Sequence, residues 1–218
     1  MNSNQKIINQ TEKFVRDQLA SADTTHDWWH TKRVWQLAKK ISDIEGGNLL
    51  VIDLSALLHD VADAKLNNGN EEQGLAKTRK FLDTLGLSQS EIEAIQLIIG
   101  NLSFRNEEQA KDIKMLELDI VRDADRLDAI GAIGIARAFN YGGSVGRAIY
   151  DPNIQPKLGM TKQQYQQAKS PTINHFYEKL LTIKDLMRTK TGKKLAAQRH
   201  SVLVQFLKDF ESEVTHTN

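Results

Sequence analysis

Apolar residues recur every three or four positions along most of this chain, in segments that short polar stretches separate. This spacing gathers apolar side chains on one face of a helix, so each segment is predicted to be helical. The predicted helices cover residues 4–20, 28–45, a segment from 49 through 61, 71–85, a segment from 88, then 113–140, 173–183 and 195–210. The sequence has no repeats and no strand hairpins. We therefore expect an all-α fold, a compact helical bundle that forms a single domain over residues 1–218.

One long segment, 141–171, lacks this periodicity. It contains all three prolines of the chain and several glycines, and structureless segments of this length are usually functional loops or disordered. We predict a long loop or a lid there. Elsewhere, local signals mark helix ends: Gly46 and Gly47 stop the second helix, and Ser88 with Glu91 has the spacing of a capping box.

Composition narrows the classes of function. The chain has 29 basic and 28 acidic residues and a formal charge of +1, so it lacks the overall field that holds nucleic acid or an acidic membrane. It has no cysteine, so any metal must be bound by histidine or carboxylate side chains. No segment approaches about 18 consecutive apolar residues and no signal peptide is visible. We expect a cytoplasmic protein without membrane or nucleic-acid partners.

A polar pair, His59-Asp60, interrupts the otherwise apolar run 57–65. Burying an imidazole and a carboxylate is costly unless something binds them. A hydrogen bond within the pair at a helix end would satisfy them, and so would a metal ion with further ligands. The candidates for those ligands are His26, His30 and the acidic cluster at 123–128. His30 is preferred over His26 because a helix would hold it rigidly.

The order of these motifs resembles a known family. His30 with Arg33-Val34, then Leu58-His59-Asp60, then Ala124-Asp125-Arg126-Leu127, on an all-helical chain, is similar to the HD-domain metal-dependent phosphohydrolases. The segments 123–138 and 172–181 look like a bacterial subgroup typified by a nucleotide pyrophosphohydrolase.

The resemblance implies that His30, His59, Asp60 and Asp125 bind one divalent ion. Manganese is favoured, and cobalt, nickel, iron, zinc or magnesium are possible. Relatives with two metals have further histidines between the His-Asp pair and the last Asp, and this chain has none from Val61 to Ala124. A single-metal site is therefore expected.

The expected catalytic groups are Asp63 and Lys65, which follow the His59-Asp60 pair in the sequence. On a helix that continued past Asp60, Asp63 would share the face of the ligands and could transfer protons, and Lys65 could neutralise phosphate. The alternative is an ion pair between Asp63 and Lys65. Further candidates for binding the substrate are Arg33, His26, Arg147, His175 and Lys179. For Arg33, a salt bridge to Asp60 or Asp125 is the competing interpretation.

The function implied by the resemblance is hydrolysis of small-molecule nucleotides. Cleavage of (deoxy)nucleoside triphosphates to monophosphate and pyrophosphate is favoured. A 5'-nucleotidase or another phosphomonoesterase is the nearest alternative, because the same metal site serves both reactions. An alternative of a different class is a non-catalytic helical regulatory module with a structural metal. The sequence does not fix the oligomeric state, and a dimer is possible.

Overall fold

The computed structural model describes residues 3–20, 27–63, 66–67, 69–102, 112–161, 164, 168 and 170–215. Over these residues the chain forms helices and no strands, which confirms the predicted all-α class. Its internal contacts define two compact units, Met1–Asp125 and Arg126–Asn218. Helix α6 (Leu116–Asp128) contains the last residue of the first unit, Asp125, and the first residues of the second. The expected single domain stays a prediction.

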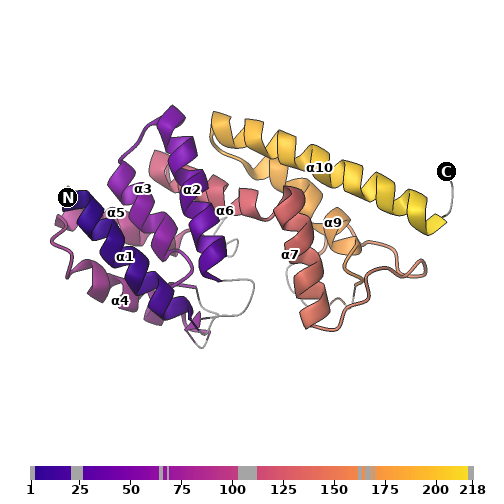
Figure 1. Cartoon of the computed structure of the whole chain (residues 1–218), viewed down its shortest axis with the longest axis horizontal. Helices are drawn as coiled ribbons and strands as arrows, with labels where there is room; N and C mark the ends of the chain where they lie inside the picture. The colour runs from indigo at the N-terminus through magenta and orange to yellow at the C-terminus, as the bar shows by residue number, and fades with distance from the viewer. Residues whose placement is uncertain are drawn as a thin grey trace. The chain divides into compact units, whose positions relative to one another are not determined.

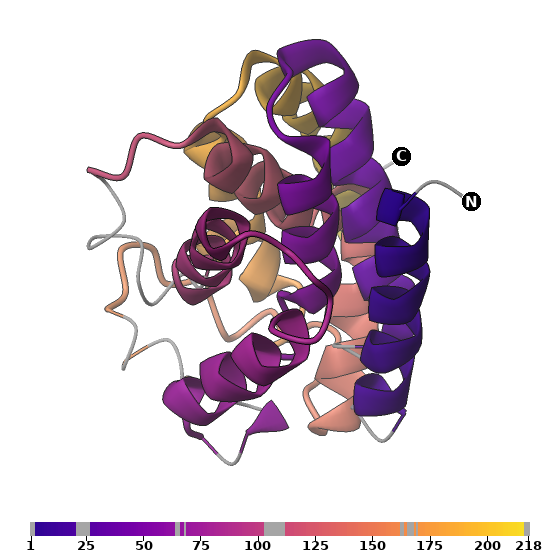
Figure 2. The ribbon, with the colours of Figure 1, turned by 90° about the vertical axis from the view of Figure 1, so that its left-hand side faces the viewer.

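The first unit is built around α3 (Leu49–Leu58), in which every residue after Leu49 is buried. Helices α1 (Ser3–Leu19), α2 (Trp28–Glu45) and α5 (Gln89–Gly100) pack against it, and α4 (Glu71–Leu82) packs against α5. Figure 1 labels these helices, and Figure 2 shows the same unit from the side. An apolar helix surrounded in this way has no solvent-facing side, which explains its continuous apolar sequence.

Helix ends follow the local sequence signals. Gly46 has a φ of 88° at the C-terminus of α2, a conformation that favours glycine. Ser88 and Glu91 form the predicted capping box at the start of α5. Helix α3, however, ends at Leu58, three residues earlier than the apolar pattern suggests, and a turn follows at residues 59–62. The apolar pattern continues there because Val61 and Ala62 are buried without being helical.

The second unit contains α7 (Gly131–Ser144), α9 (Asn174–Glu178), the 3₁₀ helix η3 (Leu180–Leu186) and α10 (Lys190–Thr215). Its core includes a cluster of aromatic rings from α7, α9 and α10, among them Phe139, Phe176 and Phe206. The single helix expected over 113–140 is wrong: α6 and α7 are separate, because Gly131 has a φ of 77°. The helix expected over 173–183 is also divided, into α9 and η3.

The non-periodic segment 141–171 is joined to α9 by side chains. The Asn174 amide donates to the carbonyl of Ile154 (2.8 Å). The Glu178 carboxylate accepts from the backbone N–H of Lys157 (3.1 Å) and the hydroxyl of Ser170 (2.9 Å). The first four residues of the segment belong to α7. Among the described residues, no helix is long and apolar enough to cross a membrane.

Candidate metal centre

His30 lies in the first turn of α2 and is buried. The Asp27 carboxylate caps this helix by accepting a hydrogen bond from the His30 backbone N–H (2.7 Å). Such a cap satisfies one of the N–H groups that the first turn leaves without a helical partner. The Asp27 cap therefore fixes the backbone from which the His30 imidazole extends.

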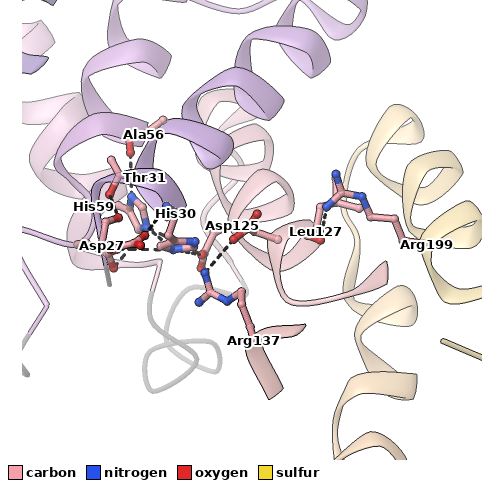
Figure 3. Close-up of polar contacts among 11 residues, drawn as sticks. Asp27, His30, Thr31, Ala56, His59, Asp125, Leu127, Arg137 and Arg199 are labelled. Atoms are coloured by element: carbon pink, nitrogen blue, oxygen red, sulfur yellow. Dashed lines mark hydrogen bonds and ion pairs between the residues drawn. The ribbon is translucent and has the colours of Figure 1, made fainter. Parts of the chain in front are cut away.

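His59 is the C-cap residue of α3 and faces His30. Its Nδ1 lies 2.8 Å from the carbonyl oxygen of Ala56. Figure 3 marks this contact with a dashed line. A carbonyl can only accept, so Nδ1 carries the proton of this bond. In the tautomer with a single ring proton, the lone pair is therefore on Nε2. That nitrogen lies 3.3 Å from Nε2 of His30. A histidine held in this way presents Nε2 as a metal donor.

Two carboxylates complete the cluster. Asp60 places one oxygen 3.5 Å from Nε2 of His30 and the other 3.4 Å from Nε2 of His59. Asp125, from α6, places Oδ1 3.5 Å from Nε2 of His30 and 3.9 Å from Nε2 of His59. All four residues belong to the first unit.

The spacing of these atoms fits a shared metal ion. His30, His59 and Asp60 each offer one donor atom, and the three atoms lie within 4.8 Å of one another. Ligands about 2.1 Å from one ion lie roughly 3.0 to 3.4 Å apart in octahedral or tetrahedral geometry. The distances of 3.3 to 3.5 Å among His30, His59 and Asp60 are close to that range. Two imidazoles with two carboxylates suit a divalent transition metal.

The electrostatics of Asp125 also favour cations. Burial acts to raise the pKa of its carboxyl, but the hydrogen bond with His30 and the charges of His59 and His30 outweigh burial. The pKa is therefore held below its ordinary value, and the group is a carboxylate at neutral pH. An ionised carboxylate beside two imidazole nitrogens is ready to bind a metal ion.

The turn after His59-Asp60 is held by residues that sequence reasoning missed. The buried Asn67 amide donates to the carbonyls of Val61 (2.9 Å) and Asp63 (2.8 Å). Gly74 of α4 packs against the same turn, since a Cβ there would lie 2.4 Å from the carbonyl oxygen of Ala62. Asn67 stands in a stretch rich in Asn and Gly, where Asn side chains often form hydrogen bonds with nearby backbone groups. This composition was the sequence signal that could have pointed to its role. The contact of Gly74 left no mark in the sequence.

Of the four expected catalytic and phosphate-binding residues of the first unit, the structure describes two, Asp63 and Arg33. Asp63 lies in the turn, since α3 does not continue to it, and its backbone N–H donates to the carbonyl of Asp60 (3.0 Å). Arg33 lies on α2 one turn after His30. Lys65 and His26 lie outside the described residues. The roles of these four residues remain predictions.

The other three candidate substrate residues come together in the second unit. Burial and the charges of Lys179 and Arg147 lower the pKa of His175 to about 4, so its imidazole is neutral near pH 7. His175 and Lys179 are one helical turn apart, joined by a backbone hydrogen bond of 3.0 Å. These residues therefore form a basic cluster of two cations and a neutral imidazole.

Two residues that follow Asp125 on α6, Arg126 and Asp128, have structural partners. Arg126 donates from Nη1 to the carbonyl of Leu186 (2.7 Å). The buried Asp128 accepts from Arg137 (2.8 Å). Both pairs lie within the second unit and fix the C-terminal end of α6.

The chain is similar to several known proteins. The family model described as the HD domain matches residues 28–130. The uncharacterized protein YpgQ of Bacillus subtilis is 34% identical over 210 residues, which cover 96% of this chain and 94% of YpgQ. The crystal structure of an HD-superfamily hydrolase from Bacillus thuringiensis is 42% identical, with a TM-score of 0.79 over 97% of this chain and 98% of the other. The crystal structure of YpgQ in complex with ADP has 31% identity and a TM-score of 0.75, over 95% of this chain and 97% of that one.

Proposed function

This chain belongs to the HD-domain superfamily of hydrolases, and on that premise we propose that it is a metal-dependent phosphohydrolase that acts on nucleotides. The observation that carries the proposal is the convergence of His30, His59 and Asp60 at distances that suit one divalent ion. Asp125 lies beside them, 3.5 Å from Nε2 of His30 and 3.9 Å from Nε2 of His59. The ADP complex of YpgQ supports a nucleotide as the ligand.

In this proposal the four residues hold one divalent transition metal, with manganese favoured. When bound, such an ion polarises phosphoryl oxygens and lowers the pKa of water. His59 and Asp60 are held by the turn that Asn67 fixes, and His30 by its capped helix. The chain's contribution is thus a rigid donor set that needs little rearrangement to bind the ion.

We assign the chemical step to the α-phosphorus of a nucleoside triphosphate. A water oxygen bonds to that phosphorus, the bond to the bridging oxygen toward the β-phosphorus breaks, and pyrophosphate leaves. Asp63 would accept the proton of the water, and Lys65 would neutralise phosphate charge. Arg33 is a proposed contact for the remaining phosphate oxygens, and His26 is proposed to line the same site. The role of Arg147, His175 and Lys179 in binding the substrate stays a prediction.

Product analysis tests this reaction. The purified chain with Mn²⁺ is incubated separately with nucleoside mono-, di- and triphosphates, and pyrophosphate and orthophosphate are measured. We expect pyrophosphate and monophosphate from triphosphates, and no orthophosphate from monophosphates. Orthophosphate from monophosphates without pyrophosphate from triphosphates would instead identify a 5'-nucleotidase. No turnover of any nucleotide would favour the non-catalytic module.

A matched pair of variants connects the reaction to the site. Asp125→Asn removes the charge of a donor, while Asp43→Asn makes the same chemical change on the exposed face of α2. Turnover should be lost in Asp125→Asn and kept in Asp43→Asn. Equal turnover in the two variants would contradict the assignment.

A further inference from the structure

The first unit has a second candidate binding site, an open pocket of about 610 Å³ where α1, α4 and residues 66–67 meet. Its volume falls within the range of roughly 300 to 1,000 Å³ typical of small-molecule sites. None of the four metal donors lines it. The described residues that do are Phe14, Leu66, Asn67, Gln73, Ala76, Lys77, Lys80 and Phe81.

The charge of the pocket selects anions. Lys77 and Lys80 lie on the exposed face of α4, and both line the pocket. Among the described residues that line it, none is acidic. Neither lysine forms an ion pair with any residue that the structure describes. Two ammonium groups that line the same pocket can bind one phosphate group or two adjacent ones.

The rest of the lining suits a planar ring. Phe14 of α1 and Phe81 of α4 are stacked, with ring centroids 4.0 Å apart and an angle of 4° between the planes. Both rings are only partly buried, so another flat ring can pack against them. Nucleobases stack favourably on aromatic side chains of this kind. The exposed Gln73 amide adds a donor and an acceptor, which base edges require.

From these features together we infer that the pocket is a second nucleotide site. The base packs on the Phe14–Phe81 pair, and the phosphate binds Lys77 and Lys80. The inference does not depend on the proposed function, because the pocket uses none of the metal donors. Its ligand would touch Asn67, the side chain that holds the carbonyls of Val61 and Asp63. A ligand bound in the pocket would therefore affect the conformation of the turn that carries His59-Asp60.

Binding without metal separates this pocket from the metal centre. The ¹⁵N-labelled full-length chain in EDTA is titrated with adenosine monophosphate, and amide chemical shifts are followed by NMR. We expect saturable shifts for residues 73–81. Adenosine alone and inorganic phosphate alone should bind at least about tenfold more weakly. Adenosine lacks the phosphate contacts with the lysines, and phosphate lacks the base contacts with the phenylalanine rings.

Charge reversal locates the site. Lys77→Glu/Lys80→Glu should weaken binding of adenosine monophosphate roughly tenfold or more, while Lys40→Glu, an equally exposed reversal on α2, should leave it unchanged. The NMR spectrum reports whether each variant is folded, and Lys77→Gln/Lys80→Gln is a milder substitute. Unchanged affinity in the double variant, absent shifts at 73–81, or equal binding of phosphate alone would overturn the inference. Metal-dependent turnover is measured separately, so failure of either proposal is recognised without the other.

Discussion

At the scale of single residues, the candidate metal centre depends on how its side chains are held as much as on which residues they are. The hydrogen bond from Nδ1 of His59 to Ala56 aims Nε2 at the cluster, and the Asp27 cap holds the helix turn of His30. That His30, His59, Asp60 and Asp125 lie together could be predicted, because their order along a helical chain is specific to a family. Their role as metal ligands stays a prediction. The groups that hold these side chains in place could not be predicted, because a backbone carbonyl partner such as that of Ala56 has no sequence signature.

The helix cap gives a residue-scale prediction. Asp27→Ala should lower the free energy of unfolding by about 1 kcal/mol and weaken metal binding, because it removes the cap of the helix that carries His30. Asp27→Asn, which keeps a side-chain oxygen at this position, should retain most of both. Chemical denaturation and Mn²⁺ titration measure the two effects. Equal behaviour of the two variants would show that the cap does not support the site.

His175 gives a prediction about pH. Its pKa is about 4 in the folded chain and about 6.5 when unfolded, so the unfolded chain binds more protons between these values. Its contribution to stability is therefore complete above about pH 6.5 and is lost as the pH falls toward 4. The contribution is on the order of 3 kcal/mol.

The measurement is the free energy of unfolding of wild type and His175→Gln from pH 4.5 to 8. The variant should lose less stability than wild type between pH 6.5 and 4.5, and the two curves should run parallel above pH 7. Parallel curves over the whole range would show that His175 titrates normally in the folded chain.

At the scale of elements, most helices could be predicted from apolar spacing, and the errors have physical causes. Gly131 adopts a left-handed conformation that separates α6 from α7. The run from Leu57 to Ala62 is apolar because it is buried, although only part of it is helical. Periodicity reports burial of one face, and a buried turn extends the pattern beyond the helix. The relation of α4 to the turn after Asp60 is a tertiary contact and left no periodic signal.

Gly74 tests that contact between elements. Alanine normally stabilises a helix interior relative to glycine by about 1 kcal/mol. At Gly74, however, the new Cβ would lie 2.4 Å from the carbonyl oxygen of Ala62 and 2.6 Å from the Asn67 amide nitrogen. Because backbone must shift to relieve this, Gly74→Ala should destabilise the chain by about 2 kcal/mol and weaken metal binding.

Gly143 of α7 is the matched control. A Cβ there would meet nothing within 4 Å, so Gly143→Ala should be neutral or stabilising by up to about 1 kcal/mol. Thermal or chemical denaturation compares the two variants. A stabilising Gly74→Ala would mean that α4 does not pack closely on the turn.

At the scale of the whole molecule, the resemblance to HD-domain proteins is confirmed by the family model and by relatives that match over nearly the entire chain. Membership makes the chain a hydrolase of this superfamily. The nucleotide, the metal and the bond cleaved are our proposals, since superfamilies keep a metal site while substrate contacts vary. Two of the proposed substrate contacts, Arg147 and His175, meet in the second unit, and this meeting depends on the tertiary fold.

The central claim is that four side chains of the first unit hold one catalytic metal ion. Mn²⁺ binding followed by electron paramagnetic resonance, which detects the free ion, tests it most directly on wild type, Asp125→Asn and Asp43→Asn. We predict one tightly bound Mn²⁺ per chain in wild type and Asp43→Asn, and affinity at least about tenfold weaker in Asp125→Asn. Equal Mn²⁺ affinity in Asp125→Asn and wild type, or no bound Mn²⁺ in wild type, would contradict the claim.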